Sequence, residues 1–255
     1  MQRGVLLPAI ATALAVSLVA AACTSAPPLA RAGELAGTAE RDLATLLADA
    51  RAKLAELAAV PEVRDGEAEA CYESVKARVP ALGPYTAFGR ADRNGLLYCI
   101  STPDSAPLDI ADRIYFQRAI ASGDFAVGNY QIGRATFMES VGFGYPVRRG
   151  SEIDGIVLAP VDLDTLAARL DEAVDLPQGA ELVVIDSTGT VLAELPDTAR
   201  WTGTPAADLP LVRQMLAQET GEGSLAGVDG TTRSYGWRAV ELSAGNLRVA
   251  VGVPG

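Results

Sequence analysis

The chain has 255 residues, of which 49% are hydrophobic and 21% charged, a composition typical of a folded protein. Its formal net charge of −11 does not supply the basic surface that nucleic acids require, so we expect no nucleic-acid partner. The absence of histidine excludes His-dependent catalytic triads, His-ligated zinc sites and His proton relays. The glycine-rich phosphate-binding and dinucleotide-binding motifs and the nucleophile elbow are also absent from the sequence. We therefore expect a binding protein without cofactor, metal or enzymatic activity, with a hydrolase that uses two carboxylates as the competing class.

Residues 1–23 have the pattern of an export segment. Arg3 is followed by 19 apolar or small residues, and Cys23 comes next. This arrangement resembles the processing site of bacterial lipoproteins, where the cysteine is lipidated, although such sites prefer leucine where this sequence has Ala20. Two alternatives stay open: an uncleaved membrane anchor, and ordinary signal cleavage after Ala22 or Ala32. All three place the rest of the chain outside the cytoplasm, and the first two attach it to a membrane.

A long helix is predicted from Glu34 to Ala59. Leucines recur there mostly at helical spacing, with alanines between them and charged residues on the other side. The pattern predicts a single helix of about six or seven turns that ends near Pro61. We interpret residues 24–60 as a linker and a stalk helix, through which two copies of the chain could form a homodimer.

The two remaining cysteines, Cys71 and Cys99, form a pair in a chain expected to lie in an oxidising compartment. A disulfide between them is the natural interpretation. Two buried free thiols are the alternative. Closing this loop of about 28 residues would stabilise the fold by ~3–4 kcal/mol in the chain-entropy model.

Two later stretches are alike: FGRADRNGLLYCIS (Phe88–Ser101) and VVIDSTGTVLAEL (Val183–Leu195). Each carries an aspartate and, three positions later, a glycine, which in the first stretch belongs to an Asn-Gly turn that favours a tight β-hairpin. A helical pattern follows each of them. DIADRIYFQRAIASG is closed by Gly123, and DLPLVRQMLAQETG by Gly221.

Three strand-like stretches then follow each helix in the same order. They are DFAVGNYQ, SVGFGYPVRR and DGIVLAPVDL in the first unit, and GSLAGVD, SYGWRAVEL and GNLRVAVGV in the second. The repetition predicts an α+β fold in which a long N-terminal helix precedes two modules, each an antiparallel sheet with helices packed on it. We expect the modules at residues 61–176 and 177–255. The space under the helix of a module is where a small ligand would bind.

This order of elements resembles the double Cache (dCache) sensor domain of bacterial chemoreceptors, histidine kinases and diguanylate cyclases, in which a long helix precedes two PAS-like modules. The likeness covers nearly all of the chain after Cys23 and is most specific at DRIYF and GNYQIGRATF. The paired cysteines also resemble those of many kinase-linked members. The resemblance implies a membrane-distal module (61–176) that recognises a small extracytoplasmic solute, and a membrane-proximal module (177–255).

The resemblance also implies candidate ligand-binding residues. In amino-acid-binding members an arginine followed by two aromatic residues holds the ligand carboxylate, and a later aspartate holds the ammonium group. Arg113, Tyr115 and Phe116 match the first part of this pattern. An upstream tyrosine is replaced by Leu108, and residues 158–160 read Leu-Ala-Pro where the aspartate would be. A small organic acid, or another polar metabolite, therefore fits better than an amino acid.

Each of these residues has an alternative role. Arg113 could form a structural ion pair with Asp109, Asp112 or another carboxylate near the helix start. We expect Asp109 and Asp112 to cap that helix. Tyr115 and Phe116 lie on different sides of a helix, so we expect one to line the pocket and the other to pack in the core.

Four further residues are candidate ligand contacts. Tyr130 and Arg134 flank Gly133, and Arg134 could be a second contact for an anion. A solvated surface is the alternative for both. Phe143 and Tyr145 alternate with glycines on one strand face, as pocket floor or as core.

At the matching place of the second module, Tyr235 and Trp237 share a strand face. No arginine cluster accompanies them, so we expect the second module to support or transmit rather than bind. Asp162 and Asp164 are explained by capping of a helix start rather than by a metal.

These observations predict an extracytoplasmic sensing protein that binds a small carboxylate or similar metabolite and passes a signal to a protein partner. A structural or interaction lipoprotein without a small ligand is the alternative. Receptors of this family usually have a second membrane helix after the proximal module, whereas this sequence ends at Gly255. We interpret the chain as a truncated receptor or as a stand-alone lipoprotein.

Overall fold

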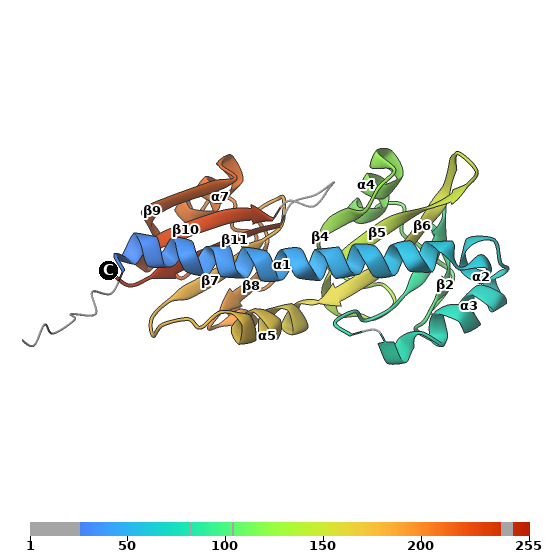
Figure 1. Cartoon of the computed structure of the whole chain (residues 1–255), viewed down its shortest axis with the longest axis horizontal. Coiled ribbons are helices and arrows are strands. Elements are labelled where there is room, and N and C mark those ends of the chain that lie inside the picture. Colours follow the sequence, from blue (N-terminus) through green and yellow to red (C-terminus); the bar gives the residue numbers. More distant parts are fainter. Residues whose placement is uncertain (1–25, 82, 104, 241–246) are drawn as a thin grey trace, which may run out of the picture.

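Helix α1 (Pro28–Ala59) runs along the whole length of the molecule, beside two antiparallel sheets (Figure 1). This computed structural model describes residues 26–81, 83–103, 105–240 and 247–255. The predicted export segment, with Cys23, lies outside these residues. Within them, no helix combines the length and the apolar character needed to cross a membrane. The start of α1 and the C-terminus lie at the same end of the molecule (Figure 1), where Ala32 packs with Val253.

One face of α1 is buried along the entire helix. It consists of small residues in the first half and leucines in the second: Ala32, Gly33, Ala36, Ala39, Leu43, Leu46, Leu47, Ala50, Leu54 and Leu57. The helix begins six residues before the predicted Glu34 and continues through Gly33 and Gly37. Glycine costs a helix about 1 kcal/mol relative to alanine. The cost is offset because Gly33 lets the backbones approach closely: a Cβ on Gly236 would lie 2.7 Å from Cα of Gly33.

The first module, called distal here after its expected position, contains a six-stranded sheet in the order β3-β2-β1-β6-β5-β4, with every pair antiparallel. The short edge strand β3 adds to the five strands expected for the unit. The strands are β1 (Gly89–Asp92), β2 (Leu96–Ile100), β3 (Leu108–Asp109), β4 (Ala126–Ile132), β5 (Glu139–Arg149) and β6 (Glu152–Asp162).

The proximal module contains a five-stranded antiparallel sheet in the order β8-β7-β11-β10-β9. Its strands are β7 (Glu181–Ile185), β8 (Val191–Leu195), β9 (Thr220–Ala226), β10 (Thr232–Val240) and β11 (Leu247–Val253). The prediction that Gly221 closes the preceding helix is wrong. Helix α7 (Pro210–Ala217) ends earlier, and Gly221 lies in β9, where the Trp237 ring occupies the space of a Cβ.

Helices cover both faces of each sheet. Helix α4 (Ile114–Ser122) lies on one face of the distal sheet, and α7 lies on the corresponding face of the proximal sheet, on the same side of the molecule (Figure 1). Helix α1 and helix α5 (Leu163–Ala173) pack on the other face, where the largest hydrophobic core runs through both modules. The remaining helices are α2 (Pro61–Arg64), α3 (Ala68–Lys76), η1 (Val79–Ala81) and α6 (Thr198–Trp201). This arrangement confirms the α+β fold predicted from the sequence.

The two predicted hairpins use the same turn chemistry. In the distal module Oδ1 of Asp92 accepts hydrogen bonds from the backbone N–H groups two and four residues later, each at 2.9 Å. Oδ1 of Asp186 accepts the equivalent pair at 2.8 and 3.0 Å in the proximal module. Gly95 and Gly189 follow with φ of 90° and 82°, a region that favours glycine. The duplicated aspartate therefore marks the same turn in both modules.

The second carboxylate oxygen of Asp186 connects the two modules. It accepts a hydrogen bond of 2.9 Å from the backbone N–H of Tyr130 in β4. Next to it, Nη2 of Arg118 in α4 donates to Oγ of Ser187 at 2.9 Å, and that hydroxyl donates to Oδ1 of Asn129 at 2.8 Å. The proximal hairpin is thus bonded directly to helix α4 and edge strand β4 of the distal module.

The structure joins Cys71 and Cys99 in a disulfide that ties α3 to β2. Because the bond closes a loop over a sequence separation of 28 residues, we expect Cys71→Ala/Cys99→Ala to lose ~3–4 kcal/mol of unfolding free energy. Urea unfolding of the oxidised protein and the variant measures this. Adding reductant should destabilise the parent protein and leave the variant unchanged. Equal stabilities would show that the loop constrains the unfolded chain little.

Candidate functional site

A small cavity lies in the distal module between the N-terminal end of α4, the turn that follows β4, and the sheet. Its volume is about 30 Å³, the space of a water molecule. The wall is mainly apolar, and its polar side chains come from Arg113, Tyr115, Gln131, Arg134 and Thr136. The remaining wall is made by Leu97, Ile100, Leu108, Ile110, Gly133, Ala135, Leu158 and Pro160.

Tyr115 reaches the cavity because glycines face it across the sheet. A Cβ on Gly142 would overlap the Tyr115 ring, and one on Gly128 would lie 3.1 Å from Cδ1 of the same ring. Tyr115 is 5% exposed, and burial raises the pKa of its hydroxyl to about 12. The side chain is therefore a neutral hydrogen-bonding group at neutral pH. Phe116, the other predicted aromatic residue, does not line the cavity but packs in the core under α4.

Arg113 is the residue that immediately precedes α4. Its Nη2 donates to the carbonyl of Ile132 at 3.2 Å, across the mouth of the cavity. Among the described residues, no carboxylate lies within ion-pair distance of its guanidinium. The structural ion pair with Asp109 or Asp112, which was the alternative for this arginine, is not formed. Arg113 therefore keeps hydrogen-bonding capacity for an anion.

Arg134 takes the carboxylate instead. Its two terminal nitrogens donate to both oxygens of Asp112 at 2.7 and 2.8 Å, and it also donates to the carbonyl of Asp109. The Arg134 guanidinium accordingly holds the pKa of Asp112 below its ordinary value. The expected capping role of the two aspartates is wrong: Asp109 accepts from the N–H of Ala111, and no side chain caps α4. The capping expected of Asp162 is confirmed at α5.

The Arg134–Asp112 pair fastens a short turn, residues 133–138, over the cavity. The turn is hydrogen-bonded within itself, from Gly133 N–H to Met138 O at 2.8 Å and from Phe137 N–H to Gly133 O at 2.9 Å. Phe137 is 82% exposed. The ion-paired side chains are 39% and 62% exposed, and pairs of this kind contribute only about 0–1 kcal/mol. This ion pair therefore adds little to the free energy that holds the turn in place.

An outer groove of about 190 Å³ adjoins the cavity and shares Arg113 and Gln131 with it. Tyr130 and Asn129 also line this groove, so Tyr130 lies beside the cavity rather than in it, with its hydroxyl bonded to Glu139. Sequence reasoning missed Gln131, although it is the neighbour of Tyr130 in β4. The signal was available, because adjacent strand residues face opposite sides of the sheet. A Tyr130 side chain on the α1 face places the Gln131 side chain on the α4 face, where the cavity lies.

Phe143 and Tyr145 are not at the cavity. Both belong to β5, and their rings pack in the core on the α1 face of the sheet, while Gly142 and Gly144 face α4. The predicted alternation is correct, but the aromatic residues are on the far side of the sheet. Their role is core packing, in which the Phe143 ring contacts the Phe125 ring with centroids 5.7 Å apart.

In the proximal module the space under α7 is filled by side chains. Tyr235 and Trp237 are 0% and 4% exposed and lie on the same face of β10, as expected. The Tyr235 hydroxyl donates to the carboxylate of Glu181, which is fully buried. Arg233 is held by Asp229 at 2.9 Å. These polar side chains are thus paired with one another, whereas Nε1 of Trp237 and Nε of Arg248 are buried without a hydrogen-bond partner among the described residues.

Glu194 is a second buried carboxyl on the proximal sheet. It is 2% exposed, and Oε2 accepts one hydrogen bond, from the N–H of Asp197 at 3.0 Å. Burial raises the pKa of Glu194 to about 7, and the nearby carboxyl of Glu181 adds to the effect. Burial also raises the pKa of Glu181. Burial therefore shifts both carboxyl groups toward their neutral forms.

No protein-family model matches the sequence, and a search of curated proteins found no match. Solved structures do match. The extracellular domain of the histidine kinase rpHK1S-Z16 has a TM-score of 0.74 at 18% identity, over 87% of this chain and 92% of that one. The ligand-binding domain of the amino-acid chemoreceptor PctB of Pseudomonas aeruginosa PAO1, in complex with L-arginine, gives 0.68 at 17% identity, over 89% and 94%. That of the chemoreceptor CtaA of Pseudomonas fluorescens, in complex with L-leucine, gives 0.65 at 16% identity, over 87% and 92%.

The chain therefore has the fold of extracellular ligand-binding domains of histidine kinases and chemoreceptors. This confirms the double Cache fold that the order of sequence elements predicts.

The contact between α4 and the sheet can be tested at Gly142. We expect Gly142→Ala to lose about 1–3 kcal/mol of unfolding free energy, because the added methyl group collides with the Tyr115 ring. Urea unfolding measures the loss. Gly223→Ala is the matched control, since a Cβ at that strand position would have no neighbour closer than 3.9 Å. Equal stabilities of the two variants would contradict the close approach of α4.

Glu194 should make the protein less stable as the pH rises. Its folded pKa of about 7 exceeds the ordinary 4.5, so ionising this buried carboxyl lowers the free energy of unfolding. This loss is absent below pH 4.5 and reaches its full value, about 3 kcal/mol, above pH 7. Glu194→Gln should be more stable than the parent at pH 8 by up to about 3 kcal/mol and nearly equal to it at pH 4.5. Urea unfolding at the two pH values tests this, with the exposed Glu219→Gln as control. An unchanged pH profile for Glu194→Gln would contradict the assignment.

Proposed function

We propose that this chain is an extracytoplasmic sensing domain that binds a small carboxylate at the cavity beside Arg113 and performs no catalysis. The observation that carries the proposal is the state of Arg113. This arginine lies between the cavity and the outer groove and forms no ion pair with a described residue. A planar guanidinium suits two-pronged binding of a carboxylate. The fold, shared with extracellular ligand-binding domains, supports the same function.

The cavity must open before it can hold a metabolite, because about 30 Å³ accommodates little more than water. The turn 133–138 is the part that would move. The exposed ion pair Arg134–Asp112, which holds the turn, is weak. The hydrogen bonds within the turn let residues 133–138 move as a unit. Opening would join the cavity to the outer groove at Arg113 and Gln131, and it would free the Arg134 guanidinium for the ligand.

The lining of the cavity favours an organic acid over an amino acid. Arg113 and Arg134 supply positive charge, whereas no aspartate or glutamate lines the cavity among the described residues. Asp112, the only carboxylate among the described residues that line the outer groove, is paired with Arg134 while the turn is closed. An ammonium group inside the cavity would therefore lack a carboxylate partner.

The conformational change would be transmitted at the end of the molecule where the start of α1 and the C-terminus lie together. The start of α1 and the C-terminus occupy one end (Figure 1), and the predicted lipid or membrane anchor precedes α1. Attachment there would leave the distal module farthest from the membrane. A protein partner at the membrane, or a second copy paired through α1, would then receive the change.

An interaction lipoprotein without a small ligand is the second candidate function. The observation that favours it is the small cavity, since side chains already fill most of the space beside Arg113. The two functions differ in one measurable property, which is stabilisation by a small molecule.

We expect a small carboxylate to raise the melting temperature of the full chain by several degrees. A ligand at a hundred times its dissociation constant stabilises the native state by ~2.7 kcal/mol. The measurement is a thermal-shift screen of mono- and dicarboxylic acids, amino acids, amines, purines and sugars. Arg113→Ala should abolish the shift and remain folded, and Arg93→Ala, an exposed arginine of the same module, should keep it. A flat screen with a folded protein would favour the interaction lipoprotein.

A further inference from the structure

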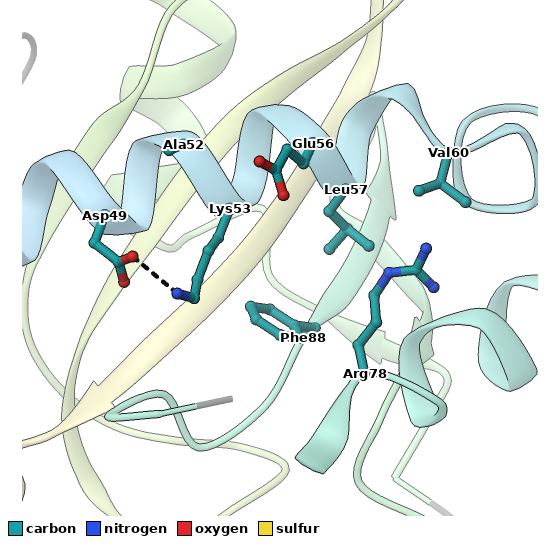
Figure 2. Close-up of a pocket in the computed structure, with 8 residues that line it drawn as sticks. All are labelled: Asp49, Ala52, Lys53, Glu56, Leu57, Val60, Arg78 and Phe88. Carbon is teal, nitrogen blue, oxygen red and sulfur yellow. Dashed lines mark hydrogen bonds and ion pairs between the residues drawn. The ribbon is translucent and has the colours of Figure 1, made fainter. Parts of the chain in front are cut away.

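A larger groove lies on the opposite face of the distal sheet, between α1 and the segment that leads from α3 into β1. Its volume is about 360 Å³, within the range of sites that bind small molecules. Figure 2 shows that side chains of α1 form one wall, while Arg78 and Phe88 approach from the other. The groove shares no residue with the cavity beside Arg113.

The floor of the groove is apolar. Leu57 and Phe88 are 3% and 5% exposed and belong to the core on the α1 face, and Val60 continues the floor toward the end of α1. Part of the surface of these side chains faces the groove (Figure 2). The apolar side chain of a ligand that lies on this floor would itself leave water, which stabilises a complex by roughly 25 cal/mol per Å² of buried apolar surface.

One end of the groove is closed by charges that satisfy each other. Nζ of Lys53 donates to Oδ1 of Asp49 at 2.8 Å, and the Tyr85 hydroxyl donates to Oδ2 at 2.8 Å. Burial alone would raise the pKa of Asp49, but these two hydrogen bonds hold it below its ordinary value. Asp49 is therefore a fixed, ionised partner of Lys53 and has little capacity left for a ligand.

Arg78 and Glu56 differ from that pair. Nη1 of Arg78 donates to the carbonyl and hydroxyl of Ser74, but Nε and Nη2 have no acceptor among the described residues. Glu56 is exposed and has no hydrogen-bond or ion-pair partner among the described residues either. The groove thus carries one cation and one carboxylate with unused capacity, on two different walls above an apolar floor.

We propose that this groove is a second ligand site, which binds a small zwitterion with an apolar side chain, the chemical class of the hydrophobic amino acids. The ligand carboxylate pairs with Arg78, the ammonium group pairs with Glu56, and the side chain lies on Leu57 and Phe88. An ion pair with each wall explains why a zwitterion suits the groove better than a simple acid or amine. Because Glu56 and Leu57 belong to α1, a bound ligand bridges the long helix and the distal module.

The test is calorimetric titration of the full chain with L-phenylalanine, 3-phenylpropionate and phenethylamine. We expect L-phenylalanine to bind at least tenfold more tightly than either analogue, since each analogue lacks one charge. Arg78→Gln and Glu56→Gln should each weaken binding about tenfold. Ala52→Trp should abolish it, because Ala52 is an exposed residue of the groove wall and a ring there fills the space without removing a polar contact. Arg113→Ala should bind normally.

Three outcomes would overturn the proposal. The first is absence of heat from L-phenylalanine up to concentrations on the order of 10 mM. The second is normal binding by Ala52→Trp, which decides the matter even if Arg78→Gln fails to fold. The third is loss of binding in Arg113→Ala with binding kept in Ala52→Trp, which would assign the amino acid to the other cavity. The thermal-shift screen with Arg113→Ala tests the cavity, and the titration with Ala52→Trp tests the groove, so either proposal can be contradicted without the other.

Discussion

The buried face of α1 is the constraint on which the rest of the structure depends. A single helix packs against both sheets, so the two modules share one continuous core and their relation is set by one straight element. Burying each of its leucines contributes about 2 kcal/mol. Polar contacts then fix the position of the helix: Asp42 pairs with Arg169 of α5 at 2.7 Å, and Arg51 with Asp124 of the distal module at 2.9 Å. A displacement of α1 at one module is therefore also a displacement at the other, since the same helix packs on both sheets.

The distal sheet separates two environments. Strand β5 sends Phe143 and Tyr145 into the core on the α1 face, while Gly142 and Gly144 leave room for Tyr115 and the backbone of α4 on the other face. The cavity beside Arg113 and the groove above Phe88 thus lie on opposite sides of one sheet. Strand β4 connects the cavity beside Arg113 to the proximal module, since Gln131 lines that cavity and the backbone N–H of Tyr130 donates to Asp186. In the proposed function, movement of the turn after β4 would pull on that bond.

The sequence by itself determined the elements whose causes are local. Asp92 and Asp186 predict the two hairpins, because an aspartate bonds the N–H groups that follow it within the same turn. Gly123 predicts the end of α4, where φ is 67°. The period of the leucines predicts α1, and the repeated order of elements predicts two modules of one fold. Arg113 and Tyr115 were instead implied by the resemblance to the sensor family, and both line the cavity.

Only the tertiary structure decided what depends on distant residues. Helix α1 continues back through Gly33 because β10 packs against it, a gain that local propensity does not contain. The partner of Asp112 is Arg134 rather than Arg113, since the turn after β4 folds back over the start of α4. Alternation along β5 is visible in the sequence, but which face meets α4 depends on the packing of both layers. The cavity volume and the groove at Arg78 likewise arise where separate segments meet, so no single stretch of sequence encodes them.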